Sequence, residues 1–423
     1  MPEPVSFQAP KGTFDVLPPE SGAYERLIAV FATLVERAGY GLVISPMFED
    51  YAVFQRVGEQ TDVVRKEMYD FYDKGDPPRH LALRPEGTAS VVRAFVEHRP
   101  SLPFKAWYAA PSFRYEAPQA GRFRQHHQLG IEALGTEDPD LDVEVIGLLA
   151  ALYRELGLRR VTCRINSLGD EVCRPAYRAA LIDYLEARAD HLCDEHRTTI
   201  HDNPLRVLDC KQPECVAATR DAPRQIDWLC GPCAAAYARV KEGLAATGVA
   251  FSEDPRLVRG LDYYTRTTFE FAAEALASAQ NAVGGGGRYG GLAESLGGPP
   301  TPGIGFGCGM ERVLLACKAE GVEPARPLVV DVFVVDTAGG AAARDLTAEL
   351  RAAGISADRA WDARSFKAQF RAADRSGAQV ALVVGPDEAE RGVVAMRRLR
   401  GGGDQTEVAR DRVINQVREL LQP

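Results

Sequence analysis

The spacing of apolar residues predicts several amphipathic helices along the chain. Between residues 22 and 37, apolar side chains recur every three or four positions, and Gly39 follows as a helix terminator. The same period predicts helices near 88–98, over 140–157 and from about Met310. These segments are expected to cover a sheet, because strand patterns lie between them.

Apolar runs and alternating polar positions predict the strands. Residues 40–51 form an apolar stretch that predicts a strand closed by Pro46. Alternation over 105–116 and 126–135, joined by a polar loop, predicts an antiparallel hairpin. A further strand is expected at 160–169.

Changes of composition divide the rest of the chain. Residues 170–252 are rich in Ala, Arg, Asp and Cys with helical periodicity, which indicates a helical insertion, and 258–315 returns to strands and glycine turns. Residues 319–327 hold two prolines and no periodicity, as a linker does. Beyond them a βαβαβ alternation predicts a separate α/β domain with a mostly parallel or mixed sheet. We therefore expect domains at 1–325 and 328–423.

Composition and charge restrict the class of protein. No apolar run is long enough to cross a bilayer, and the N-terminus, with two prolines and Glu3, has no apolar core of a secretory signal. We expect a cytoplasmic protein. The net charge of −9 argues against a nucleic-acid partner, but from Arg326 onward 15 Lys and Arg residues balance 14 Asp and Glu. A nearly neutral C-terminal domain can still carry a basic face.

The predicted hairpin carries a cluster of charged and polar side chains: Arg114, Glu116, Arg122, Arg124, Gln128 and Glu132. Alternation places Arg114 and Glu116 on one face of their strand, and Gln128 and Glu132 on one face of the return strand. Such a face offers cations for phosphate and acceptors for an ammonium group. A solvated strand pair with charge ladders explains the same pattern equally well.

Glycines dominate two segments further along. A G-x-G-x-x-G pattern at Gly285, Gly287 and Gly290 lacks the strand-to-helix setting of a dinucleotide fingerprint, so it indicates either a flexible linker or a close backbone approach. In 303–309 every second residue is glycine, which leaves one strand face bare for a flat ring such as adenine. Arg312 follows and could reach a phosphate, although simple packing of a helix on a strand is the alternative.

Two further segments place polar groups where a small ligand could bind. Glu86 and Thr88 suit an ammonium group, or they cap the helix that follows. Arg259, Tyr263 and Tyr264 open a β-branched, aromatic run and offer a fixed cation and two phenol hydroxyls.

The chain has nine cysteines, an odd number, which favours reduced thiols or a metal site over a disulfide framework. Five of them, with His196 nearby, are candidate zinc ligands: Cys193, Cys210, Cys215, Cys230 and Cys233. Buried reduced thiols are the alternative. Any such zinc would be structural, because these residues lie apart from the other clusters, and no other residue is assigned as a metal ligand.

Taken together, these segments resemble the class II aminoacyl-tRNA synthetases and, within them, the histidyl-tRNA synthetase family. Residues 39–50 with Pro46 resemble the dimer-forming first motif, 113–132 the second and 303–315 the third. The segments 259–271 and 282–292 resemble the two signatures specific to the histidine enzymes. The resemblance covers nearly the whole chain.

The resemblance implies a role for each candidate residue in one shared pocket. Arg114 and Arg259 would flank the α-phosphate of ATP. Glu86, Thr88 and Gln128 would hold the α-ammonium of histidine, Glu132 and Tyr264 its imidazole, and Tyr263 would line the same wall. The remaining ATP contacts would be Glu116, facing adenine or Mg²⁺, and Arg122, Arg124, His126 and Arg312. His126 stands where the family usually has an aromatic platform, and Ala117 where it often has a basic residue.

The resemblance also implies an architecture and an activity. The expected fold is an α+β catalytic domain, with an antiparallel sheet flanked by helices, followed by an α/β anticodon-binding domain. The expected reaction joins histidine to the 3′ end of tRNA(His) by way of histidyl-adenylate, in a homodimer. The alternative is a catalytically idle paralogue that senses histidine as a regulatory subunit in histidine biosynthesis.

A basic stripe supports the tRNA partner. Arg364, Lys367, Arg371 and Arg375 recur at helical spacing in the C-terminal domain and could contact phosphates. A solvated helix face is the alternative.

Overall fold

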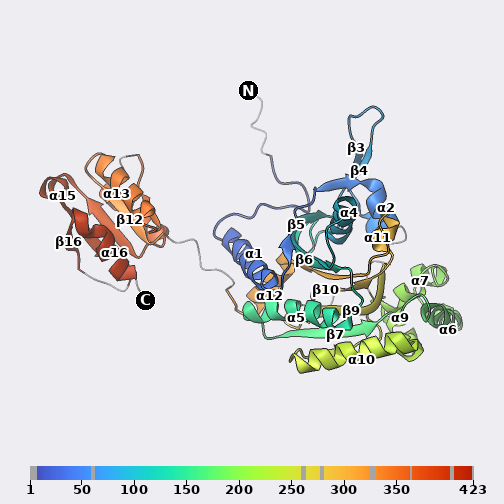
Figure 1. Cartoon of the computed structure of the whole chain (residues 1–423). Helices are drawn as coiled ribbons and strands as arrows, with labels where there is room; N and C mark the ends of the chain where they lie inside the picture. The colour runs from blue at the N-terminus through green and yellow to red at the C-terminus, as the bar shows by residue number, and fades with distance from the viewer. Residues whose placement is uncertain are drawn as a thin grey trace. The chain divides into compact units, whose positions relative to one another are not determined.

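An eight-stranded sheet forms the centre of the first of two compact units, 1–325 and 326–423, in this computed structural model (Figure 1). The structure describes residues 7–58, 62–258, 263–276, 281–323, 330–362, 364–400 and 404–421. The strands, in spatial order, are β1 (Gly41–Leu42), β5 (Phe104–Phe113), β6 (Gln125–Leu134), β11 (Gly303–Gly309), β10 (Ala282–Tyr289), β9 (Tyr264–Ala273), β7 (Val161–Ser167) and β8 (Phe251–Glu253).

The direction of the strands agrees with the expected antiparallel sheet over its central six members. Each neighbouring pair from β5 to β7 runs antiparallel. The two edges differ from the expectation, because β1 is parallel to β5 and β8 is parallel to β7. The predicted hairpin is β5 and β6, paired in register from Phe104 with Leu134 to Phe113 with Gln125.

Helices cover one face of this sheet along its length. They are α1 (Ser21–Glu36), α5 (Pro139–Glu155), α12 (Met310–Ala319) and, packed on α5, α10 (Gly231–Ala246). Leu27, Phe31 and Leu149 from these helices are buried against Ile131 and Phe306 of the sheet. The predicted helices at 22–37, 140–157 and 310 onward are therefore confirmed, because their apolar stripes face this core.

A smaller antiparallel sheet and its helices pack near the opposite face of the large sheet. It consists of β2 (Phe48–Asp50), β4 (His80–Leu83) and β3 (Asp70–Tyr72), with α2 (Tyr51–Gly58), α3 (Asp62–Lys66), α4 (Thr88–His98) and α11 (Leu292–Ser295) nearby. The strand predicted over 40–51 is mostly wrong, since only Gly41–Leu42 and Phe48–Asp50 pair. Pro46 has no N–H to donate to a ladder and interrupts the run.

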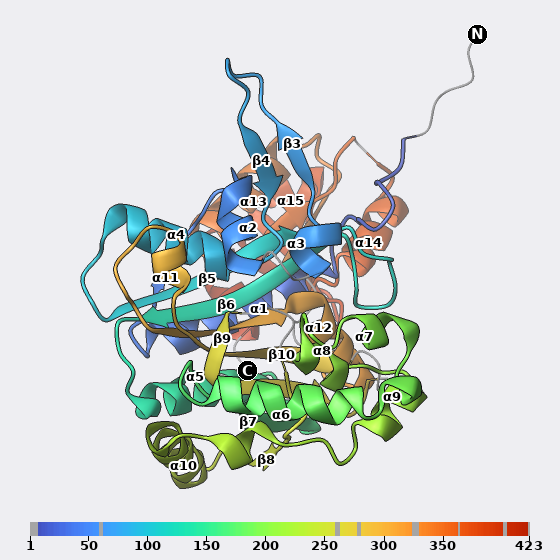
Figure 2. The ribbon, with the colours of Figure 1, turned by 90° about the vertical axis from the view of Figure 1, so that its right-hand side faces the viewer.

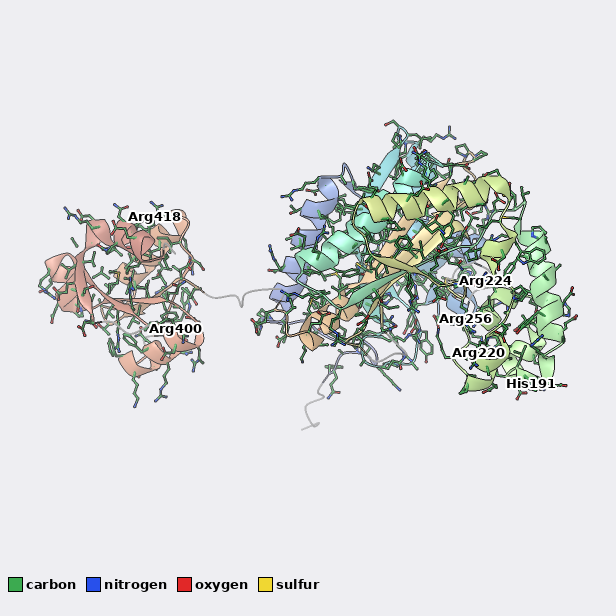
Figure 3. All side chains as sticks on the ribbon, turned by 90° about the horizontal axis from the view of Figure 1, so that it is seen from below. His191, Arg220, Arg224, Arg256, Arg400 and Arg418 are labelled. Atoms are coloured by element: carbon green, nitrogen blue, oxygen red, sulfur yellow. The ribbon has the colours of Figure 1, made fainter. Side chains whose placement is uncertain are left out.

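Residues 170–252 contain short helices, as their periodicity predicts: α6 (Arg174–Glu186), η1 (Ala189–His191), α7 (Asp194–Thr198), α8 (Pro204–Leu208), α9 (Pro213–Ala218), η2 (Gln225–Trp228) and α10. Figure 2 shows α6 to α9 gathered together, and they share a small core of their own. Arg220, Arg224 and Arg256, labelled in Figure 3, border a hollow of about 520 Å³ that is also lined by Leu208, Asp227 and Asp254.

The second unit is an α/β fold around a five-stranded sheet, in the order β13 (Ala357–Arg359), β12 (Val332–Asp336), β14 (Val380–Val384), β15 (Val393–Arg398) and β16 (Thr406–Ala409). The first three strands are parallel to one another, and β15 is antiparallel to both of its neighbours, β14 and β16. The predicted mixed sheet is therefore confirmed. Its helices are α13 (Ala341–Ala352), α14 (Phe366–Arg375), α15 (Pro386–Arg391) and α16 (Val413–Leu421), with the turn η4 (Arg410–Arg412). In neither unit does a described helix have the length and apolarity required to span a bilayer.

A buried ion pair ties β10 to the start of α5. Arg288 Nε lies 2.7 Å from Asp142 Oδ2, and both side chains are almost completely buried. The guanidinium also donates to the carbonyl oxygens of Thr136 (2.9 Å) and Asp138 (2.5 Å). The arrangement satisfies the cation on three sides, as a charge out of water requires.

Removal of one partner should therefore unfold the first unit more easily. We expect Arg288→Ala to lower the free energy of unfolding by about 3 to 5 kcal/mol, because Asp142 keeps a buried, unpaired charge. The matched control is Arg239→Ala, which breaks an exposed pair with Asp140 on the same helix and should cost less than about 1 kcal/mol. Denaturant titration measures both, and equal losses would contradict the assigned role of the buried pair.

Candidate active site

The alternating glycines of β11 form the floor of a pocket on the face of the large sheet opposite α1, α5 and α12. Gly305 and Gly307 pair with Gly287 and Gly285 of β10 on one side. The intervening Ile304, Phe306 and Cys308 point into the helix-covered core. The floor is therefore bare of side chains over two adjacent strands, as the spacing of the glycines predicts.

The wall beside this floor is β6. Gln128 pairs with Gly309 and Glu132 with Gly305, so both side chains lie on the glycine face. A Cβ atom at Gly305 would stand 2.0 Å from Glu132 Oε2. The predicted shared face of Gln128 and Glu132 is thus correct, and the glycine opposite makes room for the carboxylate.

Glu132 is completely buried and accepts two hydrogen bonds. Thr88 Oγ1 donates to Oε1 at 2.8 Å, and the hydroxyl of Tyr289 donates to Oε2 at 2.7 Å. Burial raises the pKa of Glu132 to about 8, although both hydrogen bonds oppose the shift. This carboxyl is poised to exchange its proton near neutral pH.

Glu86 and Thr88 divide the two roles that the sequence left open. Glu86 accepts from the backbone N–H groups of Thr88 (2.6 Å) and Ala89 (2.8 Å), so the glutamate, and not the threonine, caps α4. The Thr88 hydroxyl is thereby free to serve Glu132. Burial raises the pKa of Glu86.

Three tyrosines surround the same end of the wall. The rings of Tyr263 and Tyr264 lie 4.6 Å apart, and those of Tyr263 and Tyr289 5.8 Å apart. The ring of Tyr264 packs on Gly287, where a Cβ atom would lie 3.0 Å away. The buried hydroxyl of Tyr263 has no hydrogen-bond partner within the described part of the chain. A polar ligand that reached it would satisfy that group.

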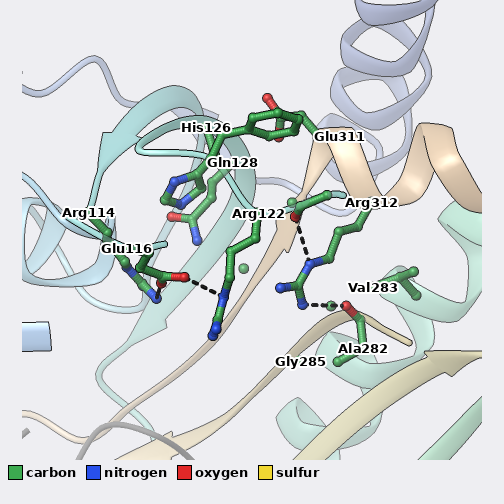
Figure 4. A pocket seen from close by; sticks show the side chains of 15 residues that line it. Arg114, Glu116, Arg122, His126, Gln128, Ala282, Val283, Gly285, Glu311 and Arg312 are labelled. Carbon is green, nitrogen blue, oxygen red and sulfur yellow. Dashed lines mark hydrogen bonds and ion pairs between the residues drawn. The ribbon is translucent and has the colours of Figure 1, made fainter. Parts of the chain in front are cut away.

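The outer part of the pocket encloses about 250 Å³ and is cationic (Figure 4). The lining includes Arg114, Glu116, Arg122, His126, Gln128, Glu311, Arg312 and glycines of β10 and β11. Arg312 Nε donates to Gly121 O at 3.0 Å and its Nη1 to Ala282 O at 3.1 Å, while Arg114 Nε donates to Pro85 O at 2.9 Å. Backbone carbonyls therefore fix both guanidinium groups.

The electrostatics of this outer part favour an anion. Burial, followed by the neighbouring Arg122, lowers the pKa of Arg312, so the cation is held at an energetic cost that a bound anion would offset. Burial and Arg114 lower the pKa of His126 to about 3. His126 consequently presents a neutral flat ring to the pocket.

Not every candidate residue lies where the strand pattern placed it. Strand β5 ends at Phe113, so Arg114 and Glu116 lie in the loop that follows and not on a strand face, because the ladder stops where the chain turns toward Arg122. Arg122 pairs with Glu116, and Arg114 Nη1 lies 3.9 Å from the same carboxylate. Arg124 does not line the pocket; its guanidinium lies over the ring of Tyr115, 3.8 Å from the centroid.

One candidate cannot be placed. Arg259 lies outside the described residues. The rejected dinucleotide fingerprint is accounted for, since Gly285 and Gly287 belong to β10 and not to a strand-to-helix turn.

Two residues of the site, Glu311 and Tyr289, were not among the candidates from the sequence. Glu311, in the first turn of α12, lines the pocket and accepts from the backbone N–H of His127 at 3.0 Å, with His127 Nδ1 2.8 Å away. The signal available in the sequence was an acidic residue directly before Arg312, at the start of a mainly apolar helix. Tyr289, which donates to Glu132, ends the glycine run and gave no signal of its own.

Comparison with known sequences gives one consistent result. A sequence model described as Histidyl-tRNA synthetase matches residues 12–313, and one described as Anticodon binding domain matches 329–420. The histidine–tRNA ligase of Saccharopolyspora erythraea is 48% identical over 99% of this chain and all of that protein.

Solved structures agree. The crystal structure of apo histidyl-tRNA synthetase from S. aureus has a TM-score of 0.82 and 35% identity, over 97% of this chain and 100% of that one. A Bacillus halodurans structure described as an ATP phosphoribosyltransferase regulatory subunit/histidyl-tRNA synthetase aligns with a TM-score of 0.61 and 20% identity over 84% of this chain. The second likeness shows a shared fold alone.

The raised pKa of Glu132 predicts a pH-dependent stability. Between the ordinary carboxyl pKa and about 8 the unfolded chain is ionised and the folded one retains the proton, so stability falls as pH rises through this window and levels off above it. Glu132→Gln should remove this slope. At pH 8 its free energy of unfolding should exceed that of the wild type by on the order of 3 kcal/mol. Denaturant titrations at pH 5 to 8 measure the difference. The control Glu294→Gln removes an exposed carboxylate from α11, and a Glu132→Gln curve parallel to wild type would refute the assignment.

Proposed function

Because this chain belongs to the histidyl-tRNA synthetase family, and is therefore an aminoacyl-tRNA ligase specific for histidine, we propose that the glycine-floored pocket is where histidine and ATP react. The observation that carries this assignment is a shared strand face: Gln128 and Glu132 of β6 lie beside the bare glycines, and Arg114 and Arg312 border the same hollow. The polar groups proposed to select histidine thus lie next to the arginines proposed to bind ATP.

The proposed reaction places negative charge among the fixed arginines. The carboxylate of histidine attacks the α-phosphate of ATP, the bond to pyrophosphate breaks, and histidyl-adenylate forms before transfer to tRNA. Charge develops on the equatorial phosphate oxygens in the transition state. Arg114 and Arg312, already oriented by backbone carbonyls, need no reorganisation to stabilise it. Arg259 is the proposed second cation at the α-phosphate.

ATP is proposed to lie across the glycine floor. The adenine ring suits the bare face next to His126, whose neutral imidazole can stack on it, and the phosphates suit Arg122 and Arg312. Mg²⁺ would neutralise phosphate charge, with Glu116 and Glu311 as the nearby carboxylates. Arg124 is a weaker candidate for a phosphate contact, because it stacks on Tyr115.

Histidine is proposed to occupy the inner end of the wall. Its imidazole has one donor and one acceptor nitrogen, which the Glu132 carboxylate and the Tyr264 hydroxyl can satisfy, with Tyr263 beside them. Each carboxylate oxygen has a second lone pair beyond the bonds from Thr88 and Tyr289. The α-ammonium is assigned to Glu86, Thr88 and Gln128. A site of this kind rejects amino acids without ring nitrogens by roughly four to five powers of ten, because its own buried groups would stay unpaired.

The histidine-sensing paralogue is the disfavoured alternative. The full-length identity to histidine–tRNA ligases argues against it, as does the match of the second unit to the anticodon-binding domain. Pyrophosphate exchange with histidine and ATP distinguishes the two, since a sensor would catalyse none.

The second unit is the proposed contact for the tRNA(His) anticodon arm. Arg364, Lys367, Arg371 and Arg375 are all exposed, and the opposite side of α14 buries Gln369 and Ala373. Four cations on one open face suit a phosphate backbone.

A homodimer is proposed from an apolar surface around the first motif. Leu42, Ile44, Met47 and Phe48 are 51%, 87%, 53% and 51% exposed. Leu42 ends the edge strand β1, whose outer side has no neighbour among the described strands, and the other three residues follow it. A contiguous apolar patch beside an open sheet edge is the signature of a protein interface, and a twofold axis would cover both copies at once.

The charge argument predicts contrasting arginine variants. Arg114→Ala should slow histidine-dependent pyrophosphate exchange by about 10²- to 10³-fold, because the transition state loses a fixed cation. Arg124→Ala, the matched control from the same loop, should lose less than about tenfold, because Arg124 lies outside the pocket lining. Similar losses in the two variants, with unfolding midpoints unchanged, would contradict the assigned positions.

The dimer proposal predicts a change of mass. Ile44→Asp should shift the protein from dimer to monomer in light scattering at micromolar concentration, because it buries a charge in the proposed interface. Phe366→Asp places the same charge on an exposed apolar residue of the second unit and should leave the mass unchanged. A wild type that is already monomeric would end the proposal.

A further inference from the structure

Two groups of potential metal ligands lie in and beside the helical segment 170–252, away from the pocket. The Cys193 cluster consists of Cys193, His196, Cys210 and Cys215. The Asp170 cluster consists of Asp170, Cys173, Cys230 and Cys233. Within each cluster the four ligand atoms all lie within 4.8 Å of one another.

These separations suit a tetrahedral metal ion. Four ligands around zinc, with Zn–S bonds of about 2.3 Å, stand about 3.8 Å from each other. Cys193 Sγ lies 2.9 Å from His196 Nδ1, and Asp170 Oδ1 lies 3.3 Å from Cys173 Sγ and 3.7 Å from Cys230 Sγ. Only small adjustments separate these distances from a closed coordination shell.

The ligand types select zinc among the common metals. Each cluster offers three sulfur atoms and one nitrogen or oxygen, and thiolates favour zinc over magnesium or calcium. Four protein ligands in each cluster fill the tetrahedral shell of zinc, which leaves no coordination position for a reacting water. A closed shell of four protein ligands indicates a structural and not a catalytic ion.

Neighbouring cations offset the negative charge of the bound forms. Arg266 Nη2 lies 3.8 Å from Asp170 Oδ2. Arg206 and Lys211 border the hollow that adjoins the Cys193 cluster. Three thiolates around Zn²⁺ leave excess negative charge, which such outer groups stabilise.

The positions of the clusters explain what the metal would hold. The Cys193 cluster joins the start of α7 to α8 and α9, helices of five or six residues that are too short to persist alone. The Asp170 cluster joins the loop after β7 to the start of α10, where the chain leaves the large sheet and returns toward it. The segments that the Cys193 cluster joins share only a small apolar core.

The Asp170 cluster also adjoins the proposed histidine site. Arg174, next to Cys173, donates to the carbonyl of Tyr264 at 2.6 Å, and the backbone N–H of Arg266 donates to Gly169 O at 2.8 Å. A metal here would hold the loop that fixes the start of β9.

We propose that this chain binds two structural zinc ions, one in the Cys193 cluster and one in the Asp170 cluster. The five cysteines considered from the sequence divide between the two sites. Asp170 and Cys173 complete the second site, and no spacing rule identified them, because Cys173 and Cys230 are 57 positions apart along the chain.

Elemental analysis of the full-length protein, purified without a histidine tag, tests the proposal. We expect two zinc ions per chain, one in Cys210→Ser, one in Cys233→Ser and none in the double variant. Cys317→Ser, which removes a buried thiol from α12 outside both clusters, is the matched control and should retain two. Wild-type protein without zinc would overturn the proposal. One zinc per chain would overturn the site whose variant still retains that zinc, and iron in place of zinc would overturn the identity of the metal.

Two measurements separate loss of metal from loss of folding. Asp170→Cys supplies a fourth thiolate and should retain the second zinc, whereas Asp170→Ala should lose it; equal loss in both overturns that site. Thiol titration of the denatured, chelated wild type should count nine free thiols, and a lower count would indicate disulfides instead. Neither readout depends on catalytic activity, so both stand even if the proposed reaction fails.

Discussion

The pairing of Glu132 with a strand that lacks side chains is the constraint on which the pocket depends. A carboxyl group can be fully buried at this point because its neighbour across the ladder, Gly305, leaves the space open. The same strand buries Ile304 and Phe306 in the core on its other face. A slip of one residue would push glycines into the core and apolar side chains into the pocket, so core packing fixes the register and the register fixes the carboxyl.

The arginines are positioned by a different means. Arg114 and Arg312 donate to main-chain carbonyls of the loops around them, which orient a cation without neutralising it. A close carboxylate partner would also fix them but would compete with a bound anion, and the Glu116 carboxylate stays 3.9 Å from Arg114 Nη1. The lowered pKa of Arg312 has the same origin, because burial and the neighbouring Arg122 destabilise its positive charge. A bound anion would stabilise that charge.

Elements with a strong period could be predicted from the sequence, and partners distant along the chain could not. Helices α1, α4 and α5, the β5–β6 hairpin and the bare face of β11 all follow from alternation or helical spacing. Arg114 and Glu116 were placed on a strand because alternation continues past Phe113, where the ladder ends.

The remaining misses share one cause. Tyr289 meets Glu132, and Glu311 meets His127, only after strands β6, β10 and β11 assemble. A period of two or 3.6 residues describes one element, whereas such contacts depend on the order of strands in the sheet. The sequence pattern therefore identified the strand faces that form the site, but it missed Tyr289 and Glu311, which contact Glu132 and His127.

The burial that raises the pKa of Glu132 also bears on selectivity. An exposed glutamate is hydrated without ligand and gains little when an N–H group replaces water. Glu132 has lost that water, and among the described residues the hydroxyls of Thr88 and Tyr289 are the hydrogen-bond donors that compensate its ionised form. A ring that donates a hydrogen bond relieves this deficit, while an aliphatic side chain of similar size would leave it unrelieved. In the proposed histidine site, the free-energy cost of the buried carboxyl would therefore become a difference in binding free energy between histidine and other amino acids.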